Sequence, residues 1–174
     1  TLSSGRGGYA RVHGLPADFL VVGKSVAGGL PCAVLGYTEA VAERLRAAEG
    51  TREPGHSGIG TTLSANPLAL AALHACLTQL MTPENHAHMD ALAARLASGM
   101  AERFAQRGVG WQVSRVGARL EFGRAPPPES GSESLASIDH ELDATMQLFL
   151  LNRGFLLTPF HNMMLVCPAL TARQ

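Results

Sequence analysis

Residues 19–31 read Phe19-Leu20-Val21-Val22-Gly23-Lys24-Ser25-Val26-Ala27-Gly28-Gly29-Leu30-Pro31. The apolar, β-branched residues at the start predict a buried strand over 19–23, and the glycines predict a turn over 27–31. Lys24 lies where this strand ends and is the only lysine in the chain. Because all other Lys/Arg positions carry arginine, the placement of Lys24 carries more information than its rarity. We expect it to be partly desolvated, which favours the neutral amine and makes it a candidate nucleophile toward a carbonyl.

The composition is that of a globular protein. The chain has 174 residues, 46% of them hydrophobic and 16% charged, which allows one medium domain or two small ones around a core. A net charge of zero gives no reason to expect nucleic acid or an anionic membrane as a partner. No apolar run approaches the roughly 20 residues of a transmembrane helix. The three scattered cysteines indicate neither disulfides nor a metal site, so we expect a cytoplasmic protein.

Hydrophobic periodicity and turn residues predict an α/β first half and a small α+β second half. Strands are expected over 19–23, 33–37, 111–113, 120–122, 155–157 and 164–167; helices over 39–48, 68–81, 83–106 and 138–152; and an exposed loop over 125–137. Asn66 and Pro67 are typical of a helix start, and the helix that follows them is apolar all round, so we expect it to be buried on most sides. A second cap and proline predict a domain boundary at Thr82, which separates residues 1–82 from 83–174.

The histidines and carboxylates form no metal-binding pattern. His86 and His88 are two residues apart on a predicted helix and therefore face different sides, which indicates surface histidines. His74 lies on the apolar helix, where we expect a core histidine with a satisfied hydrogen bond. The acidic residues at the start of the last predicted helix are expected to be solvated; they are Asp139, Glu141 and Asp143.

A second informative stretch reads Gly60-Thr61-Thr62-Leu63-Ser64-Ala65-Asn66-Pro67. The hydroxyls of Thr61 and Thr62, beside a glycine and just before a helix, could donate hydrogen bonds to an anion such as phosphate. The alternative is that they are capping hydroxyls for the helix. An amine nucleophile at Lys24 together with a phosphate-binding threonine is what a phosphorylated aldehyde requires, and pyridoxal 5'-phosphate fits both.

Both stretches resemble motifs of a known family. The family pattern P-D-L-x-x-x-G-K-x-x-x-G-G-L-P is similar to Pro16-Ala17-Asp18-Phe19 through Gly23-Lys24, followed by Gly28-Gly29-Leu30-Pro31. The pattern G-T-L-S-G-N-P-L-A is similar to Gly60 with Thr62-Leu63-Ser64-Ala65-Asn66-Pro67-Leu68-Ala69. The chain thus resembles the class III (subgroup II) pyridoxal-phosphate aminotransferases, which include glutamate-1-semialdehyde aminomutases.

The resemblance implies an α/β, fold-type-I transferase of which this chain is the C-terminal portion. Residues 1–82 would be the last part of the cofactor-binding large domain, and 83–174 a small C-terminal domain that is incomplete at its end. The family's ring-nitrogen aspartate and phosphate loop lie upstream of Thr1, so we expect the isolated segment to be inactive. Lys24 would form the Schiff base and move the substrate proton. Thr62, with Thr61, would bind the phosphate from the neighbouring subunit, which implies a homodimer with shared active sites.

The resemblance also implies a reaction, although it leaves the substrate open. The expected function is transamination between an amino acid or amine and a keto acid. The alternatives are an aminomutase or another isomerase, and a non-catalytic remnant that serves as a dimerisation module. The loop 158–164 has neither the glutamate of aminomutases nor the carboxylate-binding arginine of related aminotransferases. We therefore consider His161 a candidate substrate contact, with a solvent-facing loop histidine as the alternative.

Overall fold

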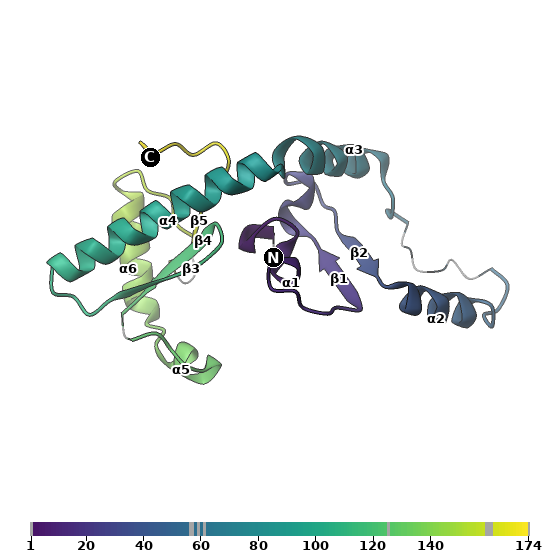
Figure 1. Cartoon of the computed structure of the whole chain (residues 1–174), viewed down its shortest axis with the longest axis horizontal. Helices are drawn as coiled ribbons and strands as arrows, with labels where there is room; N and C mark the ends of the chain where they lie inside the picture. Colours follow the sequence, from purple (N-terminus) through teal and green to yellow (C-terminus); the bar gives the residue numbers. More distant parts are fainter. Residues whose placement is uncertain are drawn as a thin grey trace. The chain divides into compact units, whose positions relative to one another are not determined.

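A computed structural model describes residues 2–55, 58, 60, 62–124, 126–158 and 162–173 of the chain (Figure 1). These residues form two compact units. The first unit centres on Arg6–Thr82, and the second consists of Pro83–Gln174 together with Ser3–Gly5. Each unit carries its own small antiparallel sheet, two-stranded in the first and three-stranded in the second.

The first unit is built on a β-ribbon with helices before and after it. Its elements are the helix α1 (Gly8–Val12), the strand β1 (Phe19–Val22), the 3-10 turn η2 (Lys24–Ala27), the strand β2 (Val34–Tyr37), the helices α2 (Glu39–Glu49) and α3 (Pro67–Ala75), and the π-helical turn η3 (Cys76–Leu80). The two strands pair from Phe19↔Tyr37 to Val22↔Val34. The strands and α2 lie within a residue of the predicted bounds.

The predicted burial of this unit is wrong in two places. Val21 in β1 is 71% exposed, and no residue of α3 is buried; Leu68, for example, is 67% exposed. A β-branched run and an all-round apolar helix predict that side chains need cover, but they do not say which part of a protein supplies it. Nothing among the described residues covers these faces.

The start of α3 forms as predicted. The side-chain oxygen of Asn66 accepts hydrogen bonds from the backbone N–H groups of Leu68, at 3.0 Å, and Ala69, at 3.3 Å, and proline occupies the first turn. The predicted single helix to residue 81 changes geometry at Cys76, where the π-helical turn η3 begins. That turn closes with a bond of 2.9 Å from the N–H of Met81 to the carbonyl of Cys76.

The second unit packs a long helix against a sheet. Its elements are α4 (Pro83–Gln106), β3 (Gln112–Val116), β4 (Arg119–Gly123), α5 (Gly131–Ala136), α6 (His140–Leu151) and β5 (Met164–Leu165), with the 3-10 turn η1 (Leu2–Ser4) at the start of the chain. The sheet order is β3-β4-β5. Its core contains Ala93, which is fully buried, and Leu120, which is 1% exposed. Met89, Leu92 and Met100 of α4 pack against this core, as the spacing of that helix predicts.

Two predictions for the second unit need correction. The predicted loop 125–137 contains the helix α5, whose N-cap Ser130 accepts from the N–H of Glu133 at 3.2 Å. The Ser-x-x-Glu spacing of a capping box was the signal for it. Residues 155–157 form no strand, and β5 has only two residues, which pair with β4. Apolar triplets alone do not show that a neighbouring strand is available to pair with them.

Candidate active site

Lys24 lies at the junction between β1 and the turn η2. Its backbone has a φ of 55°, a left-handed conformation that is costly for a residue with a side chain. Gly23, just before it, is extended, so the chain bends sharply at the lysine. Strained residues of this kind persist only where the surrounding structure holds them, and they are frequent at functional sites.

The turn that holds Lys24 is anchored in the interior of the first unit. Val26 and Ala27 are each 2% exposed, and the thiol of Cys76 donates to the carbonyl of Ser25 at 3.6 Å. The turn also contacts α3 and η3. The turn that the sequence predicts over 27–31 is present, with a bond of 3.2 Å from the N–H of Leu30 to the carbonyl of Ala27, and the 3-10 turn η2 precedes it and begins at the lysine itself. The backbone of Lys24 is therefore held in place by the buried residues that follow it.

The predicted desolvation of Lys24 is wrong for the described residues, because the side chain is exposed. Within the part of the chain that the structure describes, its amine makes no hydrogen bond or ion pair. The amine is therefore accessible to a reactant.

Thr62 lies in the turn that leads to α3 and is exposed, whereas Thr61 falls outside the described residues. The helix cap is made by Asn66, so the alternative role of Thr62 as the cap of α3 is wrong. Three residues further on, Ala65 has a φ of 57°, which bends the chain into the helix. No described contact joins Thr62 to Lys24, although both belong to the first unit. An accessible amine and an accessible hydroxyl next to a helix start fit the carbonyl and the phosphate of pyridoxal phosphate.

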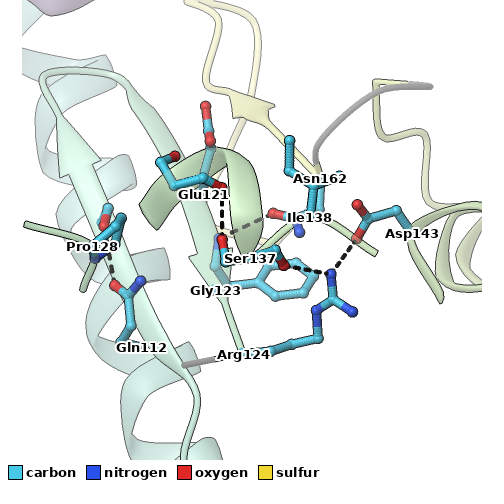
Figure 2. Close-up of a pocket in the computed structure, with 12 residues that line it drawn as sticks. Gln112, Glu121, Gly123, Arg124, Pro128, Ser137, Ile138, Asp143 and Asn162 are labelled. Atoms are coloured by element: carbon cyan, nitrogen blue, oxygen red, sulfur yellow. Dashed lines mark hydrogen bonds and ion pairs between the residues drawn. The ribbon is translucent and has the colours of Figure 1, made fainter. Parts of the chain in front are cut away.

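The second unit contains a cavity of about 410 Å³, shown in Figure 2. It lies between the end of β4, the α5 segment and α6. Polar side chains line much of it, among them Gln112, Glu121, Arg124, Asp143 and Asn162. The cavity was not foreseen from the sequence, because its lining comes from segments up to fifty residues apart (Gln112 to Asn162).

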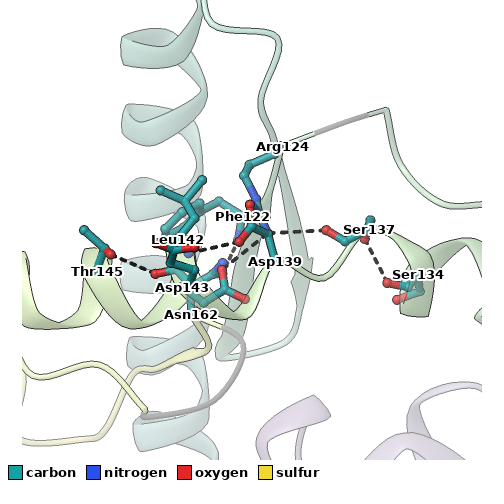
Figure 3. A network of polar contacts seen from close by, with 10 residues as sticks. Phe122, Arg124, Ser134, Ser137, Asp139, Leu142, Asp143, Thr145 and Asn162 are labelled. Carbon is teal, nitrogen blue, oxygen red and sulfur yellow. Dashed lines mark hydrogen bonds and ion pairs between the residues drawn. The ribbon is translucent and has the colours of Figure 1, made fainter.

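Arg124 is the centre of a polar network beside this cavity (Figure 3). Its guanidinium lies 3.1 Å from a carboxylate oxygen of Asp139 and 3.6 Å from one of Asp143, and it donates to the carbonyl of Ser137 at 3.3 Å. The side chains of Arg124 and Asp143 are only 21% and 16% exposed. The prediction that the acidic residues at the start of α6 are solvated is therefore wrong for Asp143, whereas the side chain of Asp139 is 53% exposed and Glu141 is exposed, as predicted.

Asp139 also caps α6. Its carboxylate accepts from the N–H of Leu142 at 3.0 Å. That backbone hydrogen bond, opposed by partial desolvation and assisted by the charge of Arg124, holds the pKa of Asp139 below its ordinary value of 3.8. The network thus keeps Asp139 ionised and joins the end of β4 to the start of α6.

The histidines take different places from one another. His74 is exposed, so its prediction as a core residue is wrong. Nε2 of His88 lies 2.9 Å from the carbonyl of Leu170. His161, the candidate substrate contact, lies outside the described residues. Among those that are described, no three His, Cys, Asp or Glu side chains are placed to hold a metal ion, and no helix is long and apolar enough to cross a membrane.

The family profile described as aminotransferase class-III matches residues 3–174. The chain therefore belongs to the class-III aminotransferase family, whose members use pyridoxal phosphate, and its fold is that of the fold-type-I enzymes. Over 133 residues it is 37% identical to a glutamate-1-semialdehyde 2,1-aminomutase of Anaeromyxobacter sp. (strain Fw109-5), a match that covers 75% of this chain and 29% of that protein.

Solved structures agree with this assignment. A glutamate-1-semialdehyde-aminomutase from Pseudomonas aeruginosa PAO1 superposes with a TM-score of 0.92 at 43% identity, over 99% of this chain and 39% of that one. A variant of that protein was solved in complex with PMP. A β-phenylalanine aminotransferase from Variovorax paradoxus superposes with a TM-score of 0.78 at 28% identity, also over 99% and 39% of the two chains. The chain thus spans well under half the length of these relatives.

Proposed function

We propose that the protein transfers amino groups between an amino acid or amine and a keto acid, with pyridoxal phosphate bound through Lys24. The observation that carries this proposal is the placement of Lys24. Its amine is accessible, while its strained backbone is held by a buried turn. When bound, the cofactor supplies a carbonyl that condenses with amines and a ring that withdraws electrons from the substrate.

The residues of the chain would act as follows. Nζ of Lys24 would hold the cofactor by condensing with its carbonyl with loss of water. Once the substrate amine has released it, the same nitrogen would take the proton from the substrate Cα and deliver it to C4′ of the cofactor. The hydroxyl of Thr62, with Thr61 beside it, donates to a phosphate oxygen. The family resemblance has Thr62 reaching the cofactor of a neighbouring subunit, so we propose a homodimer.

The two units would then be parts of two domains. We assign Arg6–Thr82 to the end of the cofactor-binding large domain and the second unit to the small C-terminal domain. The exposed apolar side chains of β1, β2 and α3 support this assignment, because such faces are normally covered by further protein. The cysteines, none of which forms a disulfide, support a location in the cytoplasm.

A second candidate function is intramolecular amino transfer. It is favoured by the aminomutase names of relatives at 37% and 43% identity. Against it stands the segment 158–164, which lacks a glutamate. An amino acceptor separates the two reactions, because only a transaminase consumes it.

The experiment is to incubate the full-length protein with pyridoxal phosphate, a series of amino donors and pyruvate, and to measure alanine. Alanine that forms in proportion to the donor consumed supports transamination. Conversion of glutamate-1-semialdehyde without formation of alanine would instead support the aminomutase reaction. A folded protein that retains the cofactor but converts neither substrate would favour the non-catalytic alternative.

A further inference from the structure

The 3-10 turn η2 that carries Lys24 is closed by its own backbone. The N–H of Val26 donates to the carbonyl of Gly23 at 3.4 Å, and the N–H of Gly28 donates to the carbonyl of Ser25 at 3.0 Å. Hydrogen bonds of this 3-10 type have a poorer geometry than those of an α-helix. The left-handed backbone of Lys24, with a φ of 55°, therefore needs support from outside the turn.

A thiol from another element supplies part of this support. Sγ of Cys76 lies 3.6 Å from the carbonyl oxygen of Ser25 and donates to it. Because a backbone carbonyl has two lone pairs, that oxygen accepts both from Cys76 and from the N–H of Gly28. Ser25 follows Lys24 directly, whereas Cys76 stands 51 positions further along the chain than Ser25. The bond thus ties the residue after the lysine to a separate part of the same unit.

Cys76 is itself held in place. It is 5% exposed and lies where the helix α3 passes into the π-helical turn η3. Its carbonyl accepts from the N–H of Met81 at 2.9 Å, the hydrogen-bond spacing of a π-helix. Both α3 and η3 contact the turn η2. Single π-helical turns are rare and frequently occur at functional sites, and this one begins at the residue whose thiol reaches the lysine turn.

The alternative role of Cys76 is packing alone, since a free cysteine behaves as a small apolar side chain. Packing alone requires no polar partner, whereas this sulfur lies within hydrogen-bonding distance of a carbonyl. The bond also lies where the buried part of the turn begins, because Val26 and Ala27 are each 2% exposed and Lys24 is exposed. A weak donor contributes more away from water than at the surface. The thiol therefore holds the backbone at the point beyond which the lysine side chain is accessible.

We propose that Cys76 is a positioning residue for Lys24 in the proposed amino-transfer reaction, on which this inference rests. Its thiol fixes the carbonyl of Ser25 and thereby keeps the strained backbone of Lys24 in the left-handed conformation. Nζ of Lys24 has to reach first the cofactor and then the substrate, so its backbone is the fixed point for both. Misplacement of a catalytic group by about 1 Å lowers the rate by up to roughly 100-fold. Cys76 acts through the turn, without itself binding cofactor or substrate.

The test uses the full-length protein and a pair of variants that differ in one group. Cys76→Val and Cys76→Thr have nearly the same shape, but only threonine keeps a donor for the carbonyl of Ser25. Ala42→Gly is the control for a general loss of stability, because Ala42 is 9% exposed within the helix α2, where glycine is destabilising. If Cys76→Val does not fold, Cys76→Ala replaces it, since alanine removes the same donor without adding volume.

The first readout is amide hydrogen exchange of the peptide that covers residues 24–30, measured without cofactor. We expect exchange about threefold faster or more in Cys76→Val, and close to the unmodified rate in Cys76→Thr and Ala42→Gly. The second readout is the kinetics of amino transfer with pyridoxal phosphate. In Cys76→Val, kcat should fall about tenfold with little change in the KM for the amino donor, because the placement of the amine affects chemistry rather than binding. Cys76→Thr should retain most of kcat.

An unchanged kcat in Cys76→Val, with or without faster exchange, would overturn the positioning role and leave the proposed function intact. A similar loss of kcat in Ala42→Gly would also overturn it, because general destabilisation would then explain the loss. A lower kcat in Cys76→Val without faster exchange would show that the thiol does not act through the turn. Absence of amino transfer in the unmodified protein contradicts the proposed function itself, and the exchange rates then still decide whether the thiol holds the turn.

Discussion

Arg124 and Asp139 form an ion pair with 3.1 Å between a guanidinium nitrogen and a carboxylate oxygen, and this pair ties the end of β4 to the first turn of α6. Asp139 uses its other carboxylate oxygen to cap the same helix through Leu142. One carboxylate therefore serves a helix cap and a contact between two elements. The ion pair requires the ionised form, and the negative charge also strengthens the helix cap.

The stability of the second unit should therefore depend on pH through Asp139. Its pKa is lowered in the folded state from 3.8, first by the hydrogen bond from Leu142. A lowered pKa contributes stability that is present above the unfolded pKa and is lost as pH falls through the folded pKa. We expect the free energy of unfolding, measured by urea at a series of pH values, to fall below about pH 4.

The matched variants are Asp139→Asn and Glu141→Gln. Asp139→Asn should be less stable than the unmodified chain at neutral pH and should lose less stability on acidification, because asparagine still caps a helix but has no charge. Glu141→Gln removes an exposed carboxylate two residues further on and should keep the acid dependence of the unmodified chain. Equal acid dependence in Asp139→Asn and the unmodified chain would contradict the role of this pair.

Gly117, in the turn between β3 and β4, should not tolerate a side chain. Its φ is 60°, and a Cβ there would clash with the backbone carbonyl of Ser3. That carbonyl accepts from the N–H of Ala118 at 2.9 Å, so the clash would also disturb this bond. We expect Gly117→Ala to lower the free energy of unfolding by about 2 kcal/mol or more.

Gly131 is the control for that substitution. It lies at the start of α5, and a Cβ there would meet no atom within 4 Å. Gly131→Ala should change the free energy of unfolding by less than about 1 kcal/mol and can raise it. If a urea titration gave similar losses in the free energy of unfolding for Gly117→Ala and Gly131→Ala, the turn at Gly117 would not be the cause of the destabilisation.

Ala65 stands where the family pattern has glycine, and its φ of 57° explains why glycine suits the position. Ala65→Gly should raise the free energy of unfolding by about 1 kcal/mol, because the left-handed conformation is costly for alanine. The same substitution at Ala71, in the middle of α3, should lower it by about 1 kcal/mol. In thermal melts, a higher stability of Ala65→Gly together with a lower stability of Ala71→Gly would verify the conformation at Ala65. A loss of stability in both variants would refute it.

Thr62→Ala should weaken cofactor retention in the full-length protein. A lost hydrogen bond to a charged phosphate costs about 1–3 kcal/mol, or roughly 5-fold to 150-fold in the Kd for pyridoxal phosphate. Thr51→Ala removes a hydroxyl that donates to the carbonyl of Ala48 and should leave the Kd unchanged. An unaltered Kd in Thr62→Ala, measured by fluorescence titration, would leave Thr62 with no role in cofactor binding.

The local features of this fold were readable in the sequence. The cap at Asn66 and the face of α4 that carries Met89 and Met100 depend on residues a few positions apart, and the structure has both. The capping-box spacing at Ser130 was also present, although the prolines nearby favoured a loop. Sequence patterns that span only a few residues predict the local backbone geometry directly, because the interacting groups are neighbours in the chain.

What the sequence did not show depends on distant partners. Val21 and the residues of α3 are exposed among the described residues, and apolar periodicity does not reveal which partner, if any, buries a side chain. Arg124 and Asp139 stand fifteen positions apart on different elements, and Asn162 meets Phe122 across forty. For the site, the motif identified Lys24, but its left-handed backbone and its accessibility came only from the structure.

The proposed function depends on binding of the cofactor by the amine of Lys24. The most direct measurement is borohydride reduction of the full-length protein with pyridoxal phosphate, followed by mass mapping of its peptides, with Lys24→Ala as the control. We expect a phosphopyridoxyl group on the peptide that contains Lys24, no such group on the corresponding peptide of Lys24→Ala, and no amino transfer by that variant. An unmodified Lys24 in a folded, full-length protein, or undiminished amino transfer by Lys24→Ala, would contradict this role of Lys24.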